Sequence, residues 1–477
     1  MSQQLFVDRN QEIIFLKERF KSKNAECIIL YGRRRVGKTE LLIQFLKDKR
    51  GIYFLASEEG DLQNIREFTH HAGLFLRDNN FERVSFESWP SLFEAFIRHT
   101  SFAEQAKLGK VVIVMDEFPY LIAHNRSIPS IFQKIWDTAL KDLPVMLVLS
   151  GSSISTMETA VLGYQSPLYG RRSGQWQVEP LPYSCIHEFL PWSDEDIAKT
   201  WFVLGGIPAY LLQFQPEKSF PENILDNILN KGAYLYSETE MLMNYEFREP
   251  ANYMIIFKAL ASGCTTLSDI CSSTGLDKSM VSKYLDVLCR LHIIKDEVPV
   301  TAPAGFRRRH YRITDPYLMF WFRFVYPNRI DIEAGRSLAV LQRILLSFPS
   351  YCGHMFELLT EECIRNRVIL ADRSFSVTGR WWYKESEIDY VCLNDSTREA
   401  VFIECKWSDL KYRDAITILH DLETKAKGVI WHNGDRVDSY CLVGRSVEDK
   451  DRLLDAGYLC YDLADLSSHE ASALDAL

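Results

Sequence analysis

The sequence predicts an α/β protein that begins with a parallel sheet, continues through mostly helical segments and ends in a second, smaller α/β domain. Three observations support this prediction. A glycine-rich loop, residues 32–39, lies between an apolar run and an amphipathic helix. A second apolar run, residues 110–117, ends in two carboxylates. Near the C-terminus, residues 401–407 alternate so that Glu404 and Lys406 lie on one face of a strand.

The glycine-rich loop fits the pattern of Gly, four residues and Gly-Lys-Thr, and it follows the β-branched run 27–31. A helix that begins near Lys38 points its N-terminal amide groups at phosphate. Lys38 would reach the β- and γ-phosphates, and the Thr39 hydroxyl would take a Mg²⁺ position. The predicted ATP site consists of Gly32, Arg33, Arg34, Arg35, Val36, Gly37, Lys38, Thr39 and Glu40.

The second apolar run is typical of a parallel strand that delivers acids to the carboxyl edge of an open sheet. We expect Asp116 to hold the Mg²⁺ shell and Glu117 to orient or deprotonate the attacking water. A third run, residues 145–153, ends in small hydroxyl residues that could sense the γ-phosphate, although such residues at strand ends are more often plain turns.

Composition agrees with a multidomain protein. The chain has 477 residues, of which 47% are hydrophobic, which is enough for several cores. Its net charge of −9 requires that any nucleic-acid binding be local. No apolar run approaches the roughly 20 residues that span a membrane, and the start is not a signal peptide, so we expect a cytoplasmic protein without a membrane partner. The eleven scattered cysteines favour reduced thiols over zinc or disulfides.

Changes of pattern predict four domains. They are a nucleotide-binding core, a helical lid on that core, a winged helix-turn-helix and a small α/β domain. Their expected boundaries are 1–180, 181–250, 251–325 and 326–477.

The third domain has the layout of a winged helix-turn-helix, with helical segments at 252–261, 266–272 and 277–291. The third helix would expose the polar and basic groups of a major-groove reader, namely Lys278, Ser279, Ser282 and Lys283. A wing would add charge that contacts phosphate, from Arg307, Arg308, Arg309 and Arg312. We therefore expect DNA contact through residues 278–312 and the C-terminal domain, although such modules also serve as interaction or spacer domains.

An acid and a lysine on one strand face suit Mg²⁺-dependent phosphodiester hydrolysis. Glu404 would hold metal, and Lys406 would orient the attacking water or offset charge. Asp389, fifteen positions earlier, supplies a second metal ligand, and Glu357 on the helix 353–364 is the fourth member. Glu-x-Lys also occurs as a charge pair on solvated strands, but the ordered set on helix, strand and strand favours the catalytic interpretation.

The N-terminal half resembles the archaeal-type AAA ATPases, a branch of the signal-transducing P-loop NTPases. The stretches that carry the resemblance are residues 6–9 with Glu12, 31–39, 115–118, 149–153, 169–172 and 205–208. The resemblance implies that Arg171 or Arg172 approaches the nucleotide of the same or a neighbouring subunit, where a guanidinium stabilises charge on the γ-phosphate. A neighbouring-subunit arginine would imply a homo-oligomer, whereas a surface arginine pair is the alternative.

The C-terminal third resembles the restriction-endonuclease-like (PD-(D/E)XK) nucleases, in which a helix glutamate, a strand aspartate and a Glu-x-Lys strand form the site. The sequence departs from that pattern at Ile388, where the family has proline. More narrowly, the chain is similar to the C-terminal domain that accompanies archaeal-type ATPases, in residues 311–323, 381–382, 387–389 and 404–407.

Two functions fit these features. In the first, ATP hydrolysis switches the protein between states and releases DNA cleavage by the C-terminal domain, for which defence against mobile DNA is one setting. In the second, the carboxylate site is inert and the protein is an ATP-dependent DNA-binding regulator or scaffold.

Overall fold

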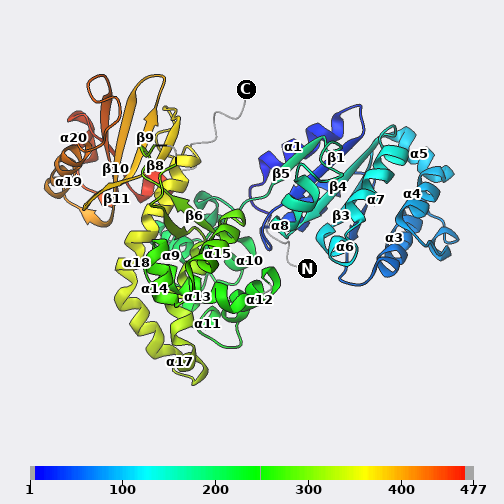
Figure 1. Ribbon diagram of the computed structural model, residues 1–477, viewed down its shortest axis with the longest axis horizontal. Coiled ribbons are helices and arrows are strands. Elements are labelled where there is room, and N and C mark those ends of the chain that lie inside the picture. The colour runs from blue at the N-terminus through cyan, green and yellow to red at the C-terminus, as the bar shows by residue number, and fades with distance from the viewer. Residues whose placement is uncertain (1–5, 248, 304, 468–477) are drawn as a thin grey trace. The chain divides into compact units, whose positions relative to one another are not determined.

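The chain folds around two five-stranded β-sheets, in a computed structural model that describes residues 6–247, 249–303 and 305–467 (Figure 1). It divides into two units, Met1–Pro180 and Leu181–Leu477, each with its own sheet. None of the helices in the described ranges combines the length and the hydropathy that a membrane span requires.

The first unit is built on a parallel sheet with the strand order β2-β3-β4-β1-β5. Its strands are β1 (Glu26–Tyr31), β2 (Gly51–Leu55), β3 (Val111–Asp116), β4 (Val145–Gly151) and β5 (Gly174–Gln177). Strands β1, β3 and β4 are buried along their whole length, which is why they are continuous apolar runs in the sequence. The three runs predicted as strands are therefore confirmed, and their carboxyl ends meet at one edge of the sheet.

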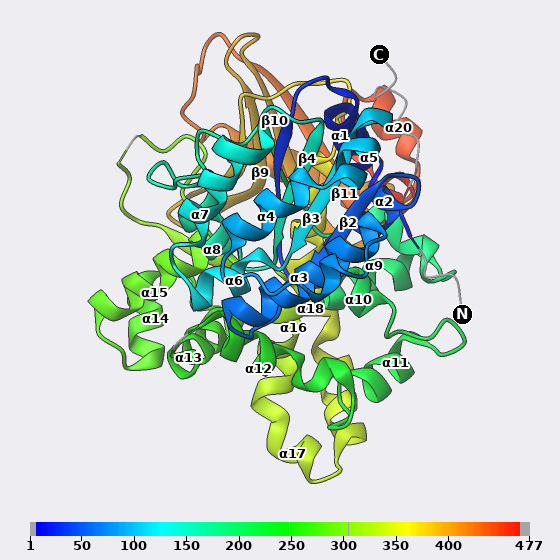
Figure 2. The same ribbon diagram turned by 90° about the vertical axis from the view of Figure 1, so that its right-hand side faces the viewer.

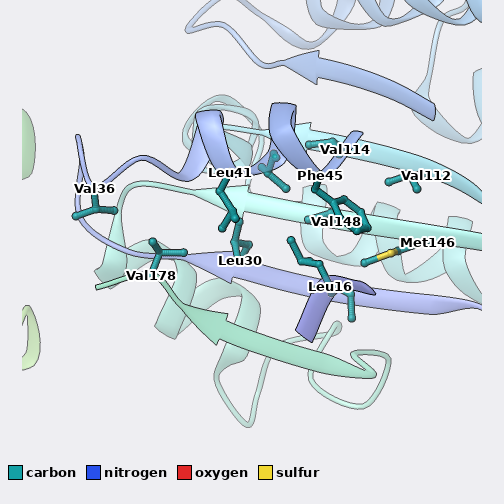
Figure 3. Packing of buried hydrophobic residues seen from close by; sticks show 12 residues of the cluster. Leu16, Leu30, Val36, Leu41, Phe45, Val112, Val114, Met146, Val148 and Val178 are labelled. Carbon is teal, nitrogen blue, oxygen red and sulfur yellow. The ribbon is translucent and has the colours of Figure 1, made fainter. Parts of the chain in front are cut away.

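Helices cover both faces of this sheet. They are α1 (Asn10–Lys21), α2 (Lys38–Leu46), α3 (Asp61–Leu76), α4 (Trp89–Arg98), α5 (Thr100–Leu108), α6 (Phe118–His124), α7 (Ile128–Ile135) and α8 (Ile154–Thr156). On one face, Leu16 of α1 and Phe45 of α2 pack on Leu30 and Val148 (Figure 3). On the other face, α3 and α4 lie toward the viewer in Figure 2. This packing holds α2 against the sheet and so fixes the position of its N-terminus, where the glycine-rich loop ends.

The second unit begins with helices. They are α9 (Asp194–Leu204), α10 (Pro208–Leu211), α11 (Phe220–Asn227), α12 (Tyr234–Glu246), α13 (Pro250–Ala261), α14 (Leu267–Thr274), α15 (Lys278–Arg290), α16 (Pro316–Phe320), α17 (Arg329–Glu333) and α18 (Ser337–Arg365). Helices α13 to α15 occupy the three segments predicted as helical, and Gly275 ends α14 with a positive φ of 70°. Helix α9, in the segment predicted as a lid, packs against α16 and α18. A lid on the nucleotide domain stays a prediction.

The C-terminal sheet is mixed, with the order β12-β11-β10-β9-β8. Its elements are β8 (Val377–Tyr383), β9 (Ser386–Asn394), β10 (Glu399–Leu410), β11 (Val437–Val447), β12 (Leu459–Tyr461), α19 (Tyr412–Ala426), α20 (Lys450–Asp455) and α21 (Leu463–Ser467). Strands β8, β9 and β10 are antiparallel, and β10, β11 and β12 are parallel. Phe402 of β10 packs with Leu422 of α19, whereas Trp407 contacts Phe356 of α18, so the two helices cover opposite faces.

A buried ionic network joins the strand pair β6 (Ile294–Glu297) and β7 (His310–Ile313) to α18 and β9. Arg312 donates to Glu297 Oε1 and Glu361 Oε2, both at 2.9 Å, and to the Tyr390 hydroxyl at 3.3 Å. Although burial acts in the opposite direction, Arg312 and Lys295 lower the pKa of Glu361. The expectation that Arg312 contacts DNA phosphate is wrong, because its side chain is only 7% exposed and two carboxylates neutralise its charge.

Candidate functional site

The loop after β1 has the backbone conformation that the phosphate-binding pattern predicts. A Cβ atom at Gly32 would lie 2.2 Å from the Val178 carbonyl oxygen, so only glycine fits there. Gly37 takes a positive φ of 94° and leads directly into α2. The buried Lys38 ammonium donates to the carbonyl oxygens of Gly32, at 2.9 Å, and Arg33, at 2.8 Å. The loop therefore curves around the Lys38 ammonium group at the N-terminus of α2.

Side chains from outside the loop hold it in place. Arg9 donates to the Val36 carbonyl oxygen at 2.7 Å and pairs with Glu12 at 2.9 Å. Arg34 donates to the Tyr120 hydroxyl at 2.7 Å. Val36 belongs to the buried core, whereas Arg33, Arg35 and Glu40 are partly exposed on the loop and the first turn of α2.

The predicted Mg²⁺ ligands lie side by side. Thr39 Oγ1 donates to Asp116 Oδ2 at 2.8 Å, and the Tyr53 hydroxyl donates to the same oxygen at 2.7 Å. The Glu117 amide binds the other carboxylate oxygen at 3.0 Å. Burial, together with the Asp116 charge, raises the pKa of Tyr53, so this phenol stays a hydrogen donor. A hydroxyl and a carboxylate in contact form a hard oxygen pair, and this chemistry fits Mg²⁺.

Glu117 lies at the same edge, where β3 ends. Its backbone has a positive φ of 51°, which is uncommon for a residue with a side chain. Its Oε2 atom accepts hydrogen bonds from the Ser152 hydroxyl, at 2.7 Å, and the Ser152 amide, at 3.3 Å. Ser152 follows β4. The site is therefore built at the ends of three strands: the loop follows β1, the two acids lie at the end of β3, and the serine follows β4. No sequence pattern marks Tyr53 as part of the site, and the pattern at Ser152 predicts only a sensor of the γ-phosphate.

The two candidate arginines differ in their surroundings. Arg171 forms an ion pair with Asp137 at 2.9 Å, in the π-helical turn Trp136–Leu140. Arg172 donates to the Leu162 carbonyl oxygen at 3.0 Å and lies 4.6 Å from the centre of the Tyr169 ring. Burial raises the pKa of Tyr31, and the positive charge of Arg172 opposes this shift. The charge of Arg172 is therefore felt by Tyr31, the last residue of β1, directly before the glycine-rich loop.

In the second unit, the predicted carboxylates converge from α18, β9 and β10. Asp389 and Glu404 are only 7% and 6% exposed. The pairing of β9 with β10 ends at Tyr390 and Ile403, and beyond it Asp389 Oδ2 accepts from the Cys405 amide at 2.8 Å. Burial, with the charges of Glu357 and Glu404, raises the pKa of Asp389 to about 7. The structure thus brings Glu357 and Glu404 close enough to Asp389 for their charges to act on it.

Cations already pair with two of these carboxylates. Lys406 and Lys425 contact Glu404 Oε1 at 2.8 and 3.3 Å, and Arg380 contacts Glu357 Oε2 at 2.6 Å. In the part of the chain that the structure describes, no three His, Cys, Asp or Glu side chains are grouped to hold a metal ion. The oxygens of Asp389 and Glu404 suit Mg²⁺, but a metal would compete with the two ammonium groups for Glu404. Lys425 and Arg380 were not among the predicted residues.

The third helix of the α13 to α15 group presents its polar side chains outward. Lys278, Ser279 and Lys283 are exposed, and Ser282 is half-buried. Between β6 and β7, Arg307 and Arg308 are exposed, whereas Arg309 forms an ion pair with Asp296. The basic surface is therefore smaller than the sequence predicted.

Comparison with known proteins assigns the chain to a family. Residues 6–214 match an ATPase domain predominantly from Archaea, and residues 321–418 match a family described as archaeal and bacterial proteins of unknown function. The uncharacterized protein MJECL04 of Methanocaldococcus jannaschii is 34% identical over 468 residues, which cover 97% of this chain and 100% of the relative.

A solved structure is similar in fold. The Walker-type ATPase PABY2304 of Pyrococcus abyssi has a TM-score of 0.53 and 21% identity, and the match covers 67% of this chain and 96% of that one. Together with the parallel sheet and the glycine-rich loop, these matches explain the first unit as a P-loop ATPase domain. The chain therefore belongs to the family of archaeal-type P-loop ATPases that includes MJECL04, with an ATPase domain followed by a C-terminal domain on a mixed sheet.

Proposed function

We propose that this protein is an ATP-hydrolysing switch coupled to a C-terminal domain that cleaves DNA with the help of Mg²⁺. The observation that carries the ATP part is the hydrogen bond of 2.8 Å between Thr39 and Asp116. This bond joins the start of α2 to the end of β3, so the phosphate loop and the acidic strand share one site.

The residues of this site have separate tasks in hydrolysis. The loop amides and Lys38 bind the phosphates, which places the γ-phosphate at the carboxyl edge of the sheet. Mg²⁺ bound by Thr39 and Asp116 would offset negative charge on the phosphate oxygens. Glu117 orients the attacking water and accepts its proton, while Ser152 holds the glutamate side chain. Arg172 is our candidate for the arginine that stabilises charge on the γ-phosphate, within the chain or across a homo-oligomer.

We divide the chain at residues 1–180, 181–250, 251–325 and 326–477, as the sequence predicts. Helices α13 to α15 with the β6–β7 pair have the order of elements of a winged helix-turn-helix. Exposed Lys278, Ser279 and Lys283 on α15 support its use as a DNA-reading helix, with phosphate contacts from Arg307 and Arg308.

For the C-terminal domain we propose a restriction-endonuclease-like active site. Glu357, Asp389 and Glu404 come from a helix and two strands. Burial and the charges of the two glutamates disfavour ionised Asp389, which supports a role in binding a divalent cation. Mg²⁺ held by Asp389 and Glu404 would polarise the scissile phosphate. Lys406, whose pKa Glu404 raises although burial opposes this, stays charged and orients the attacking water.

A second function is favoured by the ion pairs at this site. Glu404 contacts two lysines and Glu357 contacts Arg380, so two of the three carboxylates already have cationic partners. If these pairs persist in the presence of Mg²⁺, the domain is an inert scaffold. The protein is then an ATP-dependent DNA-binding regulator.

The deciding experiment is cleavage of plasmid and linear DNA by the purified protein in Mg²⁺ or Mn²⁺, with and without ATP. We expect the protein to cut, Lys406→Ala to abolish cutting, and the exposed Lys427→Ala to cut like wild type. No cutting under any nucleotide condition would favour the regulator. Cutting that Lys406→Ala retains would show that the activity arises elsewhere.

A further inference from the structure

A cavity of about 770 Å³ lies at the amino edge of the first unit's sheet. It is lined by the segments that lead into four parallel strands, namely residues 20–23 before β1, 47–50 before β2, 108–110 before β3 and Pro144 before β4. Because parallel strands start at one edge and end at the other, this cavity is opposite the ATP site. Its volume falls in the range of roughly 300–1,000 Å³ that is usual for ligand sites.

The cavity is strongly basic in a protein that is acidic as a whole. Six cationic residues and one carboxylate, Asp48, line it. The cations are Lys21, Lys23, Lys47, Lys49, Arg50 and Lys110. With a net charge of −9 for the whole chain, such a concentration of one sign creates a local positive potential.

Some of these cations have structural partners. Lys110 donates to the carbonyl oxygens of Arg19, at 3.0 Å, and Asn24, at 2.8 Å, and so fixes the turn between α1 and β1. Lys49 pairs with Asp48 and lies 4.5 Å from the centre of the Phe45 ring. These two side chains shape the cavity wall.

Other cations face solvent without an acidic partner. Lys21, Lys23 and Lys47 are exposed, and within the described ranges no carboxylate lies at ion-pairing distance from them. They lie at or just beyond the C-termini of α1 and α2, each of which carries about half a negative charge. The two helix ends thus offset about one charge, which leaves a clear positive excess.

We propose that this cavity binds successive phosphates of a nucleic-acid strand. The order β2-β3-β4-β1 separates the segments before β2 and β1 by three strand spacings, or about 14 Å. Successive phosphates of one strand lie farther apart than the roughly 3.4 Å rise per nucleotide along a duplex axis, so this span accommodates about two or three of them. Flexible lysines at the rim suit contacts to a backbone, which carry no sequence information. The inference is independent of the proposed DNA cleavage and of the α15 surface.

The test measures binding of a fluorescein-labelled 20-nucleotide single strand to the full-length protein by anisotropy, across a series of salt concentrations. The test variant is the triple alanine substitution Lys21→Ala, Lys23→Ala and Lys47→Ala. Its matched control removes three exposed cations of the same unit that do not line the cavity, Arg66→Ala, Arg83→Ala and Lys134→Ala. A third variant keeps the charge, with Lys21→Arg, Lys23→Arg and Lys47→Arg.

Each phosphate contact to a single strand contributes about 0.7 to the slope of log affinity against log salt. Loss of three contacts should lower the slope by about 2 and weaken binding roughly 10- to 100-fold at 0.1 M salt. The control and the arginine variant should bind like wild type.

Two results would overturn the proposal. In one, the triple alanine variant keeps the affinity and salt slope of the control. In the other, inorganic tripolyphosphate displaces the strand at the same phosphate concentration, which would assign the cavity to a small polyphosphate. Neither readout involves ATP hydrolysis or DNA cutting, so the outcome is distinct from that of the proposed function.

Discussion

Replacing Asp389 with Asn should stabilise the protein at high pH, because the wild-type carboxyl must ionise where it is buried and where Glu357 and Glu404 lie near it. Its pKa in the folded protein is about 7, well above the ordinary value of an aspartate. For a carboxyl whose folded pKa is raised, stability is fully present below the unfolded pKa and is lost as the pH rises through the folded pKa. Since one pKa unit corresponds to about 1.36 kcal/mol, the loss is on the order of 1–2 kcal/mol at pH 5 and on the order of 4 kcal/mol at pH 8.

Thermal unfolding of the full-length protein without divalent metal measures this effect. For a unit of about 300 residues, 4 kcal/mol corresponds to roughly 6 °C, so Asp389→Asn should unfold about 6 °C higher than wild type at pH 8 and about 2 °C higher at pH 5. The asparagine still offers an oxygen to the Cys405 amide. Mg²⁺ should raise the unfolding temperature of wild type more than that of the variant.

The exposed Asp395→Asn, in the turn after β9, controls for removal of a carboxylate from the same domain. The reasoning would be refuted if the difference between Asp389→Asn and wild type stayed constant from pH 5 to pH 8. A constant difference would show that neither burial nor the neighbouring carboxylates raise the pKa of Asp389 in the folded protein.

Three further outcomes are expected. Lys38→Ala should weaken ATP binding about 10- to 100-fold, because a charged hydrogen bond contributes about 1.5–3 kcal/mol, and calorimetry with Lys134→Ala as the control checks this. Glu117→Gln should bind ATP normally but slow hydrolysis roughly 10²- to 10⁴-fold in a phosphate-release assay, and an unchanged rate would exclude it as the general base. Arg312→Met should cost about 3–5 kcal/mol in the free energy of unfolding, because two buried carboxylates lose their partner. Denaturant unfolding with no change for Arg312→Met would mean that water replaces the guanidinium.

The ATP site could be predicted from sequence because its parts are local. A buried parallel strand appears as an apolar run, and the loop or acid that follows it is adjacent in the chain. Thr39 and Asp116 were placed in this way, and the structure brings them into contact. Tyr53 could not be predicted, since it reaches Asp116 from a neighbouring strand and its hydrogen bond depends on sheet order.

The C-terminal site could be predicted only in part, because some of its residues come from distant elements. The helix predicted at 353–364 extends back to Ser337 through Pro349, a residue that ordinarily interrupts a helix. The alternation of β10 correctly placed Glu404 beside Lys406. Lys425, 21 positions after Glu404, reaches it from α19 on the same face of the sheet, and no local pattern marks such a partner.

The network around Arg312 determines where the chain can be divided. A fragment that begins at residue 326 would keep Glu361 and Tyr390 but lose Arg312, which pairs with both. It would also expose the surface that β7 covers in the full chain. A fragment that begins at residue 181 retains every member of the network. Expression trials should therefore use the longer fragment, and exchange of the C-terminal domain between relatives should carry the β6–β7 pair with it.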